Sequence, residues 1–179
     1  MRLFLAIHPP PETAVALASL LTTAALPDHR PTAPAAIHCT VLFLGERGPR
    51  ELDEILEGAA ACCAGLAPFA LRPLRLRCLP ERDPRRTVVV ECDRPATLLE
   101  IHDRAARRFA RSPSQATRER FLPHLTVARF PGAGVAAGLD AEVDLPPFEV
   151  DAVSLMSSLL RPAGAEHRAV GRFALDRRR

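Results

Sequence analysis

The sequence contains no lysine, asparagine, tryptophan or tyrosine, so all 24 of its basic residues are arginines. Without lysine the chain cannot form a lysyl–nucleotide intermediate or a Schiff base, and it has no P-loop lysine. Any stacking on a base must come from phenylalanine, histidine or arginine, because the two larger aromatic side chains are absent. These absences exclude ATP-driven ligation through an adenylylated lysine.

The cysteines and apolar runs do not indicate a disulfide-rich, zinc-binding or membrane protein. The five cysteines form no CxxC pair, and only Cys62 and Cys63 are adjacent, which is a poor geometry for chelation. We therefore expect buried free thiols, with neither a disulfide framework nor a zinc ribbon. No stretch approaches about 18 uninterrupted apolar residues, so we expect a soluble, cytoplasmic protein without a membrane partner.

The length and the patterning predict a single α+β domain over residues 1–179. Apolar patterning predicts strands at residues 2–7, 37–45, 69–79, 87–92, 121–130, 148–158 and 167–175. Helical spacing predicts helices at residues 10–26, 49–66 and 96–111. The segment 112–120 is polar and predicts a loop. Neighbouring strands in this order predict a largely antiparallel sheet.

One short pattern occurs twice, at positions close to half the chain apart. Residues 38–41 and 124–127 both read His-x-Thr-hydrophobic. Each copy starts a predicted strand, follows a predicted helix and loop, and precedes a phenylalanine and a glycine. The echo predicts an internal duplication, with two similar lobes related by an approximate twofold axis.

Strand geometry gives this echo a chemical interpretation. Residues i and i+2 of a strand point to the same face, so His38 lies beside Thr40, and His124 lies beside Thr126. Two such strands across a cleft present two imidazoles and two hydroxyls. One imidazole can remove a proton from an attacking oxygen while the other protonates a leaving oxygen. The hydroxyls can donate hydrogen bonds to phosphate oxygens, so the set suits metal-free phosphodiester cleavage, with the two imidazoles about 5 to 8 Å apart.

A single His-x-Thr carries little information, because a lone histidine at a strand end is usually structural. Two copies of the motif at matched positions favour a catalytic role for both histidines. The remaining histidines have no such partner, and we expect His29 and His102 at the surface. His8 and His167 can approach the cleft, although we expect ordinary structural roles for both.

Four segments of the chain resemble a known family. The opening MRLFLAIHPPPE, the stretches IHCTVLFLGE and FLPHLTVARF, and the ending SLLRPAGAEHRAVGRFAL are similar to the RNA 2′,3′-cyclic phosphodiesterases, also called 2′-5′ RNA ligases, of the 2H phosphoesterase superfamily. The resemblance covers nearly the whole chain. It implies a bilobal α+β fold in which two similar antiparallel sheets, flanked by helices, enclose a central cleft.

The resemblance also implies an activity and roles for the paired residues. The family hydrolyses RNA 2′,3′-cyclic phosphates to 2′-phosphomonoesters without a metal or nucleotide cofactor, and its members can also join RNA ends through a 2′-5′ linkage. By resemblance His38 is the proton donor, His124 is the proton acceptor that activates water, and Thr40 and Thr126 bind the phosphate. The implied partners are RNA ends or small nucleotides that carry a cyclic phosphate, and we expect a monomer.

Several positions depart from the family pattern. Cys39 replaces a leucine at a core-facing position, Leu122 replaces a basic residue, and His167 replaces the tyrosine of the final hairpin. Arg129 is common in the family, but strict alternation places it on the face opposite His124 unless a bulge intervenes. It is therefore either a phosphate ligand or a member of a structural ion pair.

Two other functions stay open. The missing aromatics are compatible with a 2H phosphoesterase for a small cyclic nucleotide or a 2′-5′ oligonucleotide. A non-catalytic RNA-end binder is the alternative from another class, although binding alone does not require two histidines.

Overall fold

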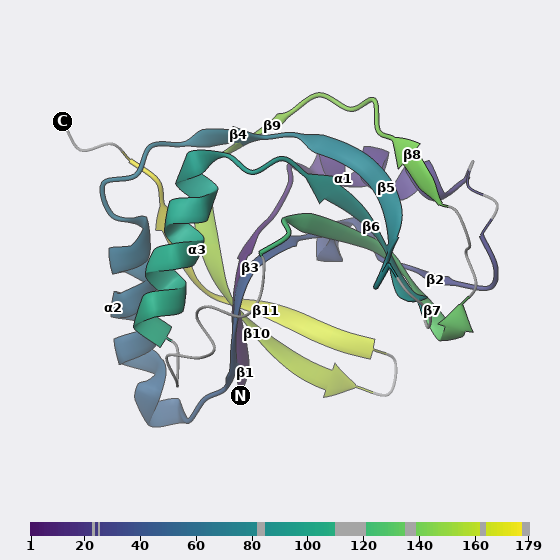
Figure 1. The fold of residues 1–179 in the computed structure, drawn as a ribbon. Helices are drawn as coiled ribbons and strands as arrows, with labels where there is room; N and C mark the ends of the chain where they lie inside the picture. Colours follow the sequence, from purple (N-terminus) through teal and green to yellow (C-terminus); the bar gives the residue numbers. More distant parts are fainter. Residues whose placement is uncertain are drawn as a thin grey trace.

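The computed structural model describes residues 1–22, 24, 26–81, 85–109, 121–134, 139–161 and 164–176. Within these ranges a curved antiparallel sheet runs through the molecule and carries three α-helices on its outside (Figure 1). The helices are α1 (Pro11–Ser19), α2 (Leu52–Cys63) and α3 (Ala96–Phe109). Short 3₁₀ turns lie at Leu20–Thr22, Pro34–Ala36 and Pro49–Glu51.

Nine of the described strands form one sheet, in the order β11-β10-β1-β3-β7-β6-β5-β8, with β2 also beside β7. Their bounds are β1 Arg2–Ile7, β2 Arg30–Pro31, β3 Cys39–Glu46, β5 Pro73–Leu79, β6 Arg85–Cys92, β7 His124–Gly134, β8 Asp140–Glu142, β10 Ala152–Arg161 and β11 Gly164–Ala174. The strands β4 (Phe69–Leu71) and β9 (Phe148–Val150) form a separate antiparallel pair.

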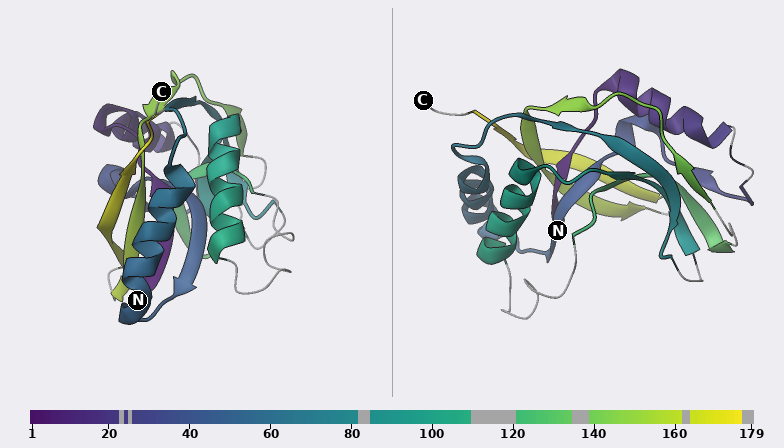
Figure 2. Two further views of the ribbon diagram at one scale, coloured as in Figure 1. Left: turned by 90° about the vertical axis from the view of Figure 1, so that its left-hand side faces the viewer. Right: turned by 45° about the horizontal axis from the view of Figure 1, so that its top comes forward.

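The large sheet consists of two four-stranded halves, β11-β10-β1-β3 and β7-β6-β5-β8. A single antiparallel residue pair, Cys39 with Leu125, joins them. In the first half α2 packs against β10 and β11, and α3 packs against β3, whereas α1 lies by the second half (Figure 2). The predicted bilobal α+β fold is confirmed, and the two sheets meet at the repeated motif.

Burial explains why the sheet has two different faces. In β1 every residue from Leu3 to Ile7 is buried, so this strand is covered on both sides. Its odd-numbered residues belong to the main core under the helices, whereas Phe4 and Ala6 form a small second cluster with Met156 on the opposite face. All five cysteines are buried free thiols, as predicted. The helix-free face is therefore the one left for a ligand.

Some predicted boundaries were wrong. The strand expected at 69–79 breaks at Arg72, whose N–H donates to an Asp93 carboxylate oxygen at 2.8 Å. The strand expected at 148–158 breaks at Asp151, and the first helix ends at Ser19. The short strands β2 and β8 were not predicted, because two or three residues are too few to show alternation. The predicted loop 112–120 lies outside the described residues.

None of the helices in the described ranges is long and apolar enough to cross a membrane.

Candidate active site

The repeated motifs meet where β3 pairs with β7. Because Cys39 pairs antiparallel with Leu125, His38 lies next to Thr126 and Thr40 lies next to His124. Cys39 and Leu125 point into the core and are 0% exposed. Their four neighbours therefore point to the opposite face, and all four are partly exposed. The strand register thus places both motifs on one face of the sheet.

The same register indicates how far apart the two imidazoles are. His38 and His124 are diagonal neighbours across the strand pair, a relation that separates side chains by roughly 7 to 8 Å at their bases. A phosphate can be placed between groups at this spacing. The 5 to 8 Å separation of the rings themselves stays a prediction.

Both histidines are held by the same hydrogen bond. The Nδ1 of His38 lies 2.8 Å from the Ala36 carbonyl oxygen, and the Nδ1 of His124 lies 2.8 Å from the Leu122 carbonyl oxygen. A carbonyl can only accept, so each Nδ1 carries the proton. This fixes both rings and leaves each Nε2 available, as an acceptor when the ring is neutral and as a donor when it is protonated.

Two matched β-bulges change which residues follow each motif on this face. In β3, Leu5 pairs with Leu42 and Ala6 with Thr40, so Val41 is an extra residue. In β7, Val88 pairs with Ala128 and Val89 with Thr126, so Val127 is the extra residue. A bulge of this kind shifts the alternation by one residue.

The residues that the bulges bring to the site face are Phe43 and Arg129, each five positions after its histidine. Phe43 pairs with Phe4, their ring centroids are 5.8 Å apart, and Phe43 is 68% exposed. Arg129 pairs with Thr87 and is exposed. Strict alternation would have placed Arg129 on the far face. The bulge instead places it on the same face as His124. The structural counterpart of Phe43 is Arg129, although the sequence echo suggested Phe130.

Aromatic and imidazole rings surround His38. Its ring centroid lies 5.1 Å from Phe4, 5.1 Å from His167 on β11, and 5.8 Å from His8. Both His8 and His167 thus lie against a motif histidine, so each approaches the site, and the ordinary structural role expected for them stays a prediction. The sequence alone does not show the contact of His167 with His38, because β11 reaches β3 only through β10 and β1.

This environment keeps His38 neutral. Burial, partly offset by the Ala36 hydrogen bond and reinforced by His167, His8 and Arg129, lowers the pKa of His38 to about 4. The pKa of His8 is lowered by burial and then by His167, and the pKa of His167 by burial and then by Arg129. Arg129 lowers the pKa of both His38 and His167, which agrees with the strand register that places it on their face of the sheet.

The surroundings of His124 are different. Its strand neighbour in β6 is Glu91, whose carboxylate accepts a hydrogen bond of 2.7 Å from Arg77. Arg77 also pairs with Glu81 at 2.6 Å. The first motif thus has aromatic and imidazole rings and the Arg129 guanidinium near it, whereas the second has the Glu91 carboxylate, which is held by an arginine.

The other histidines lie away from this face. His102 was expected at the surface, but its side chain is only 16% exposed and its ring stacks on Phe121 with centroids 4.3 Å apart. The Nδ1 of His29 is 2.9 Å from the Pro27 carbonyl oxygen, and this residue is also partly buried. Both residues are thus partly exposed and remain surface residues, although each ring has a partner.

Cys39, at the centre of the first motif, is not placed for chemistry. Burial raises the pKa of its thiol to about 12, and the side chain is 0% exposed. The prediction that this position faces the core is confirmed. In the described part of the chain, no three histidine, cysteine or acidic side chains are grouped so that they could hold a metal ion.

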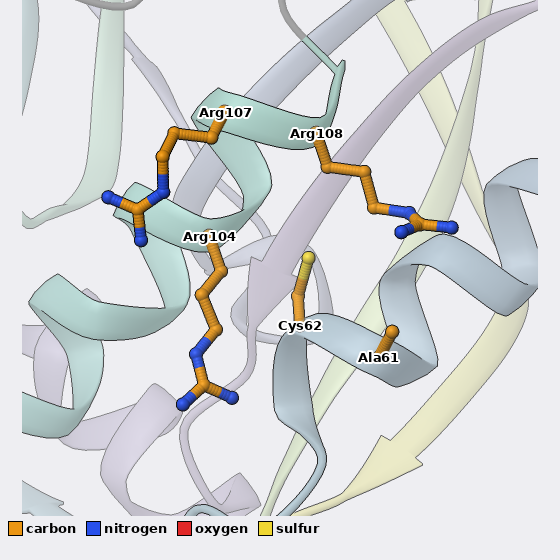
Figure 3. A pocket seen from close by; sticks show the side chains of 5 residues that line it. All are labelled: Ala61, Cys62, Arg104, Arg107 and Arg108. Carbon is orange, nitrogen blue, oxygen red and sulfur yellow. The ribbon is translucent and has the colours of Figure 1, made fainter.

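A hollow between α2 and α3 lies apart from the motifs. It is lined by Ala61, Cys62, Arg104, Arg107 and Arg108 (Figure 3). Arg104 pairs with Glu100 at 2.7 Å and also donates to the Ala64 carbonyl oxygen. The hollow contains neither motif histidine, so the crossing of β3 and β7 is the better candidate for chemistry.

Comparison with known proteins identifies the family of this chain. Residues 9–161 match the family model of the 2′-5′ RNA ligase superfamily, and the chain belongs to this family, the 2H phosphoesterases. Curated protein sequences give no significant match.

Solved structures share the fold over almost the full chain. TT0787 of Thermus thermophilus is 26% identical with a TM-score of 0.84, covering 98% of both chains. E. coli LigT in its apo form is 22% identical with a TM-score of 0.72, covering 97% of this chain and 96% of LigT. LigT with ATP bound is 25% identical with a TM-score of 0.70, covering 97% of each chain.

Proposed function

We propose that this protein hydrolyses RNA 2′,3′-cyclic phosphate ends to 2′-phosphomonoesters by two-histidine acid–base catalysis. The observation that carries the proposal is the paired arrangement of His38, Thr40, His124 and Thr126 on one face, with both Nε2 atoms available. Membership of the 2′-5′ RNA ligase superfamily supports it. In 2′-5′ joining of RNA ends, the 5′-hydroxyl of a second RNA takes the place of water as the attacking group and O3′ again leaves, so the same two histidines can serve as base and acid.

The proposed reaction needs one proton accepted and one donated. His124 Nε2 removes a proton from water, and the water oxygen attacks the phosphorus. The bond from phosphorus to O3′ breaks, and His38 Nε2 donates its proton to O3′. The product carries its phosphate on O2′, and the pair has exchanged one proton that solvent restores.

The lowered pKa of His38 adds a condition to this role. His38 is neutral in the free protein near pH 7, because its pKa is about 4. A phosphate anion beside the ring favours the charged form. We therefore propose that His38 takes up its proton together with the substrate, and that Arg129, on the same face, contributes positive charge next to the bound nucleotide.

The two threonines contribute less than the histidines in this scheme. Thr40→Ala and Thr126→Ala should each lower kcat by about 10- to 100-fold, since each removes one hydrogen bond to a phosphate oxygen that gains charge in the transition state. Thr→Ser at the same positions retains the hydroxyl and is the matched control. Equal activity of the Ala and Ser variants would remove that threonine from phosphate binding. Steady-state kinetics on adenosine 2′,3′-cyclic phosphate measures kcat of the Ala and Ser variants.

The direct test of the proposed function is turnover of that substrate in EDTA. The rate should be unchanged by the chelator, because two imidazoles supply the acid and the base. Chromatography of the nucleotides measures the rate. Loss of activity in EDTA that is restored by zinc or manganese would contradict the proposal.

One observation supports a base-binding role within the same site. Phe43 is 68% exposed and lies next to Phe4 on the site face, so it offers an apolar surface without a covering side chain among the described residues. Stacking of a base on such a ring is worth about 1 to 3 kcal/mol and tolerates any base. A small cyclic nucleotide is therefore a second candidate substrate.

A further inference from the structure

Two arginines lie directly opposite each other at the edge of the site. Arg30 in β2 pairs with Arg129 in β7, and the next pair is Pro31 with Ala128. Residues directly opposite in an antiparallel pair point to the same face. The side chain of Arg30 is therefore on the face that Arg129 shares with His38, and both arginines are exposed.

This pairing opposes stability in the free protein. Like charges directly opposite in a sheet repel each other. Among the residues described, neither arginine forms an ion pair or a side-chain hydrogen bond, and Asp28, two residues before Arg30, makes no ion pair with it. Other exposed arginines on this chain do have carboxylate partners, such as Arg75 with Asp140 and Arg172 with Asp151. A negatively charged ligand can supply the anionic partner that these two arginines lack.

The pair also lies at a definite position relative to the motifs. Arg129 is three residues beyond Thr126, a spacing of roughly 10 Å at about 3.3 Å per residue. Arg30 is held there because the Thr32 N–H donates to the Val127 carbonyl oxygen at 2.8 Å, at the bulge itself. The chain then runs from β2 through a 3₁₀ turn to His38.

We propose that Arg30 and Arg129 form a second phosphate subsite, which takes the phosphate on O5′ of the ribose whose 2′ and 3′ oxygens carry the reacting group. That phosphate is the nearest second anion in any RNA end. The identity of the ribose rests on the proposed function, whereas the two-arginine anion site rests on the strand register alone. Arg30 lies outside both His-x-Thr motifs, so the motifs alone do not predict that it is part of the site.

Equilibrium binding tests this subsite without any turnover. The ligands are adenosine 2′-monophosphate, adenosine 2′,5′-bisphosphate and the dinucleotide ApA with a 2′-phosphate at its end, each titrated by calorimetry. The second phosphate should lower Kd by about tenfold, the scale of one partly exposed charge-assisted hydrogen bond. A gain with the bisphosphate alone indicates a small-nucleotide source, and a gain with both indicates an RNA chain.

The variant Arg30→Gln should lose this gain while its Kd for the monophosphate changes by less than twofold. Arg30→Lys should retain part of the gain. Arg50→Gln changes an exposed arginine in the 3₁₀ turn after β3; it is the matched control and should behave as the wild type. A gain that persists in Arg30→Gln, or no gain in the wild type, would overturn the subsite. Failure of the proposed function would look different: intact binding of all three ligands with no hydrolysis of the cyclic phosphate.

Discussion

His38→Ala and His124→Ala should each lower kcat on adenosine 2′,3′-cyclic phosphate by about 10²- to 10⁴-fold, the usual contribution of a positioned acid or base. Each imidazole is fixed by one Nδ1 hydrogen bond to a backbone carbonyl and has its Nε2 free for the substrate. The double variant should lose much less than the product of the two single losses, because neither group works without the other. Steady-state rates of the three variants measure this.

His38→Gln and His124→Gln separate chemistry from folding. A glutamine amide can still donate to the Ala36 or Leu122 carbonyl, but it cannot transfer a proton near neutral pH. These variants should keep the wild-type circular dichroism and melting temperature and show the same loss of kcat as the alanine variants. Full activity in a glutamine variant would remove that histidine from the mechanism, and intact RNA-end binding with an inactive wild type would favour a non-catalytic binder.

The protein should lose stability on mild acidification because of His38. Its folded pKa is about 4, against an ordinary value of 6.5. Above pH 6.5 both folded and unfolded states hold a neutral ring. Between pH 6.5 and 4 the unfolded state binds a proton that the folded state does not, so the free energy of unfolding decreases as the pH is lowered, by up to about 3 kcal/mol. Below pH 4 this contribution is fully lost.

Urea unfolding of the wild type and of His38→Gln at several pH values isolates this effect. The carboxylates titrate in both proteins, so the difference between the two curves reports on His38. The wild type should lose stability relative to the variant from pH 6.5 down to 4, and the difference should stay constant at higher pH. Parallel curves over the whole range would contradict the lowered pKa.

The fold and the centre of the site could be predicted from the sequence because the repeated motif is local. His38 and Thr40, and His124 and Thr126, share faces by strand alternation alone, and the echo predicted that the two strands would meet. The meeting point, Cys39 with Leu125, agrees with both apolar positions facing the core.

The rest of the site depends on features that alternation does not reveal. Val41 and Val127 are ordinary apolar strand residues, and nothing in their identity marks a bulge, yet the bulges decide where Phe43 and Arg129 point. His167 lies next to His38 because of the order of the strands in the sheet. The two-residue strand β2 is too short for any periodic pattern, so the position of Arg30 required the structure.

The most direct test of the account is the position of the phosphate in the product. Hydrolysis of adenosine 2′,3′-cyclic phosphate, followed by ³¹P NMR in EDTA, distinguishes a 2′- from a 3′-phosphomonoester. If His38 protonates O3′ while His124 activates water, the wild type should give only the 2′-phosphate, and the His38→Gln and His124→Gln samples should retain the cyclic signal. A 3′-phosphate product, or turnover at the wild-type rate in either variant, would contradict the proposed mechanism.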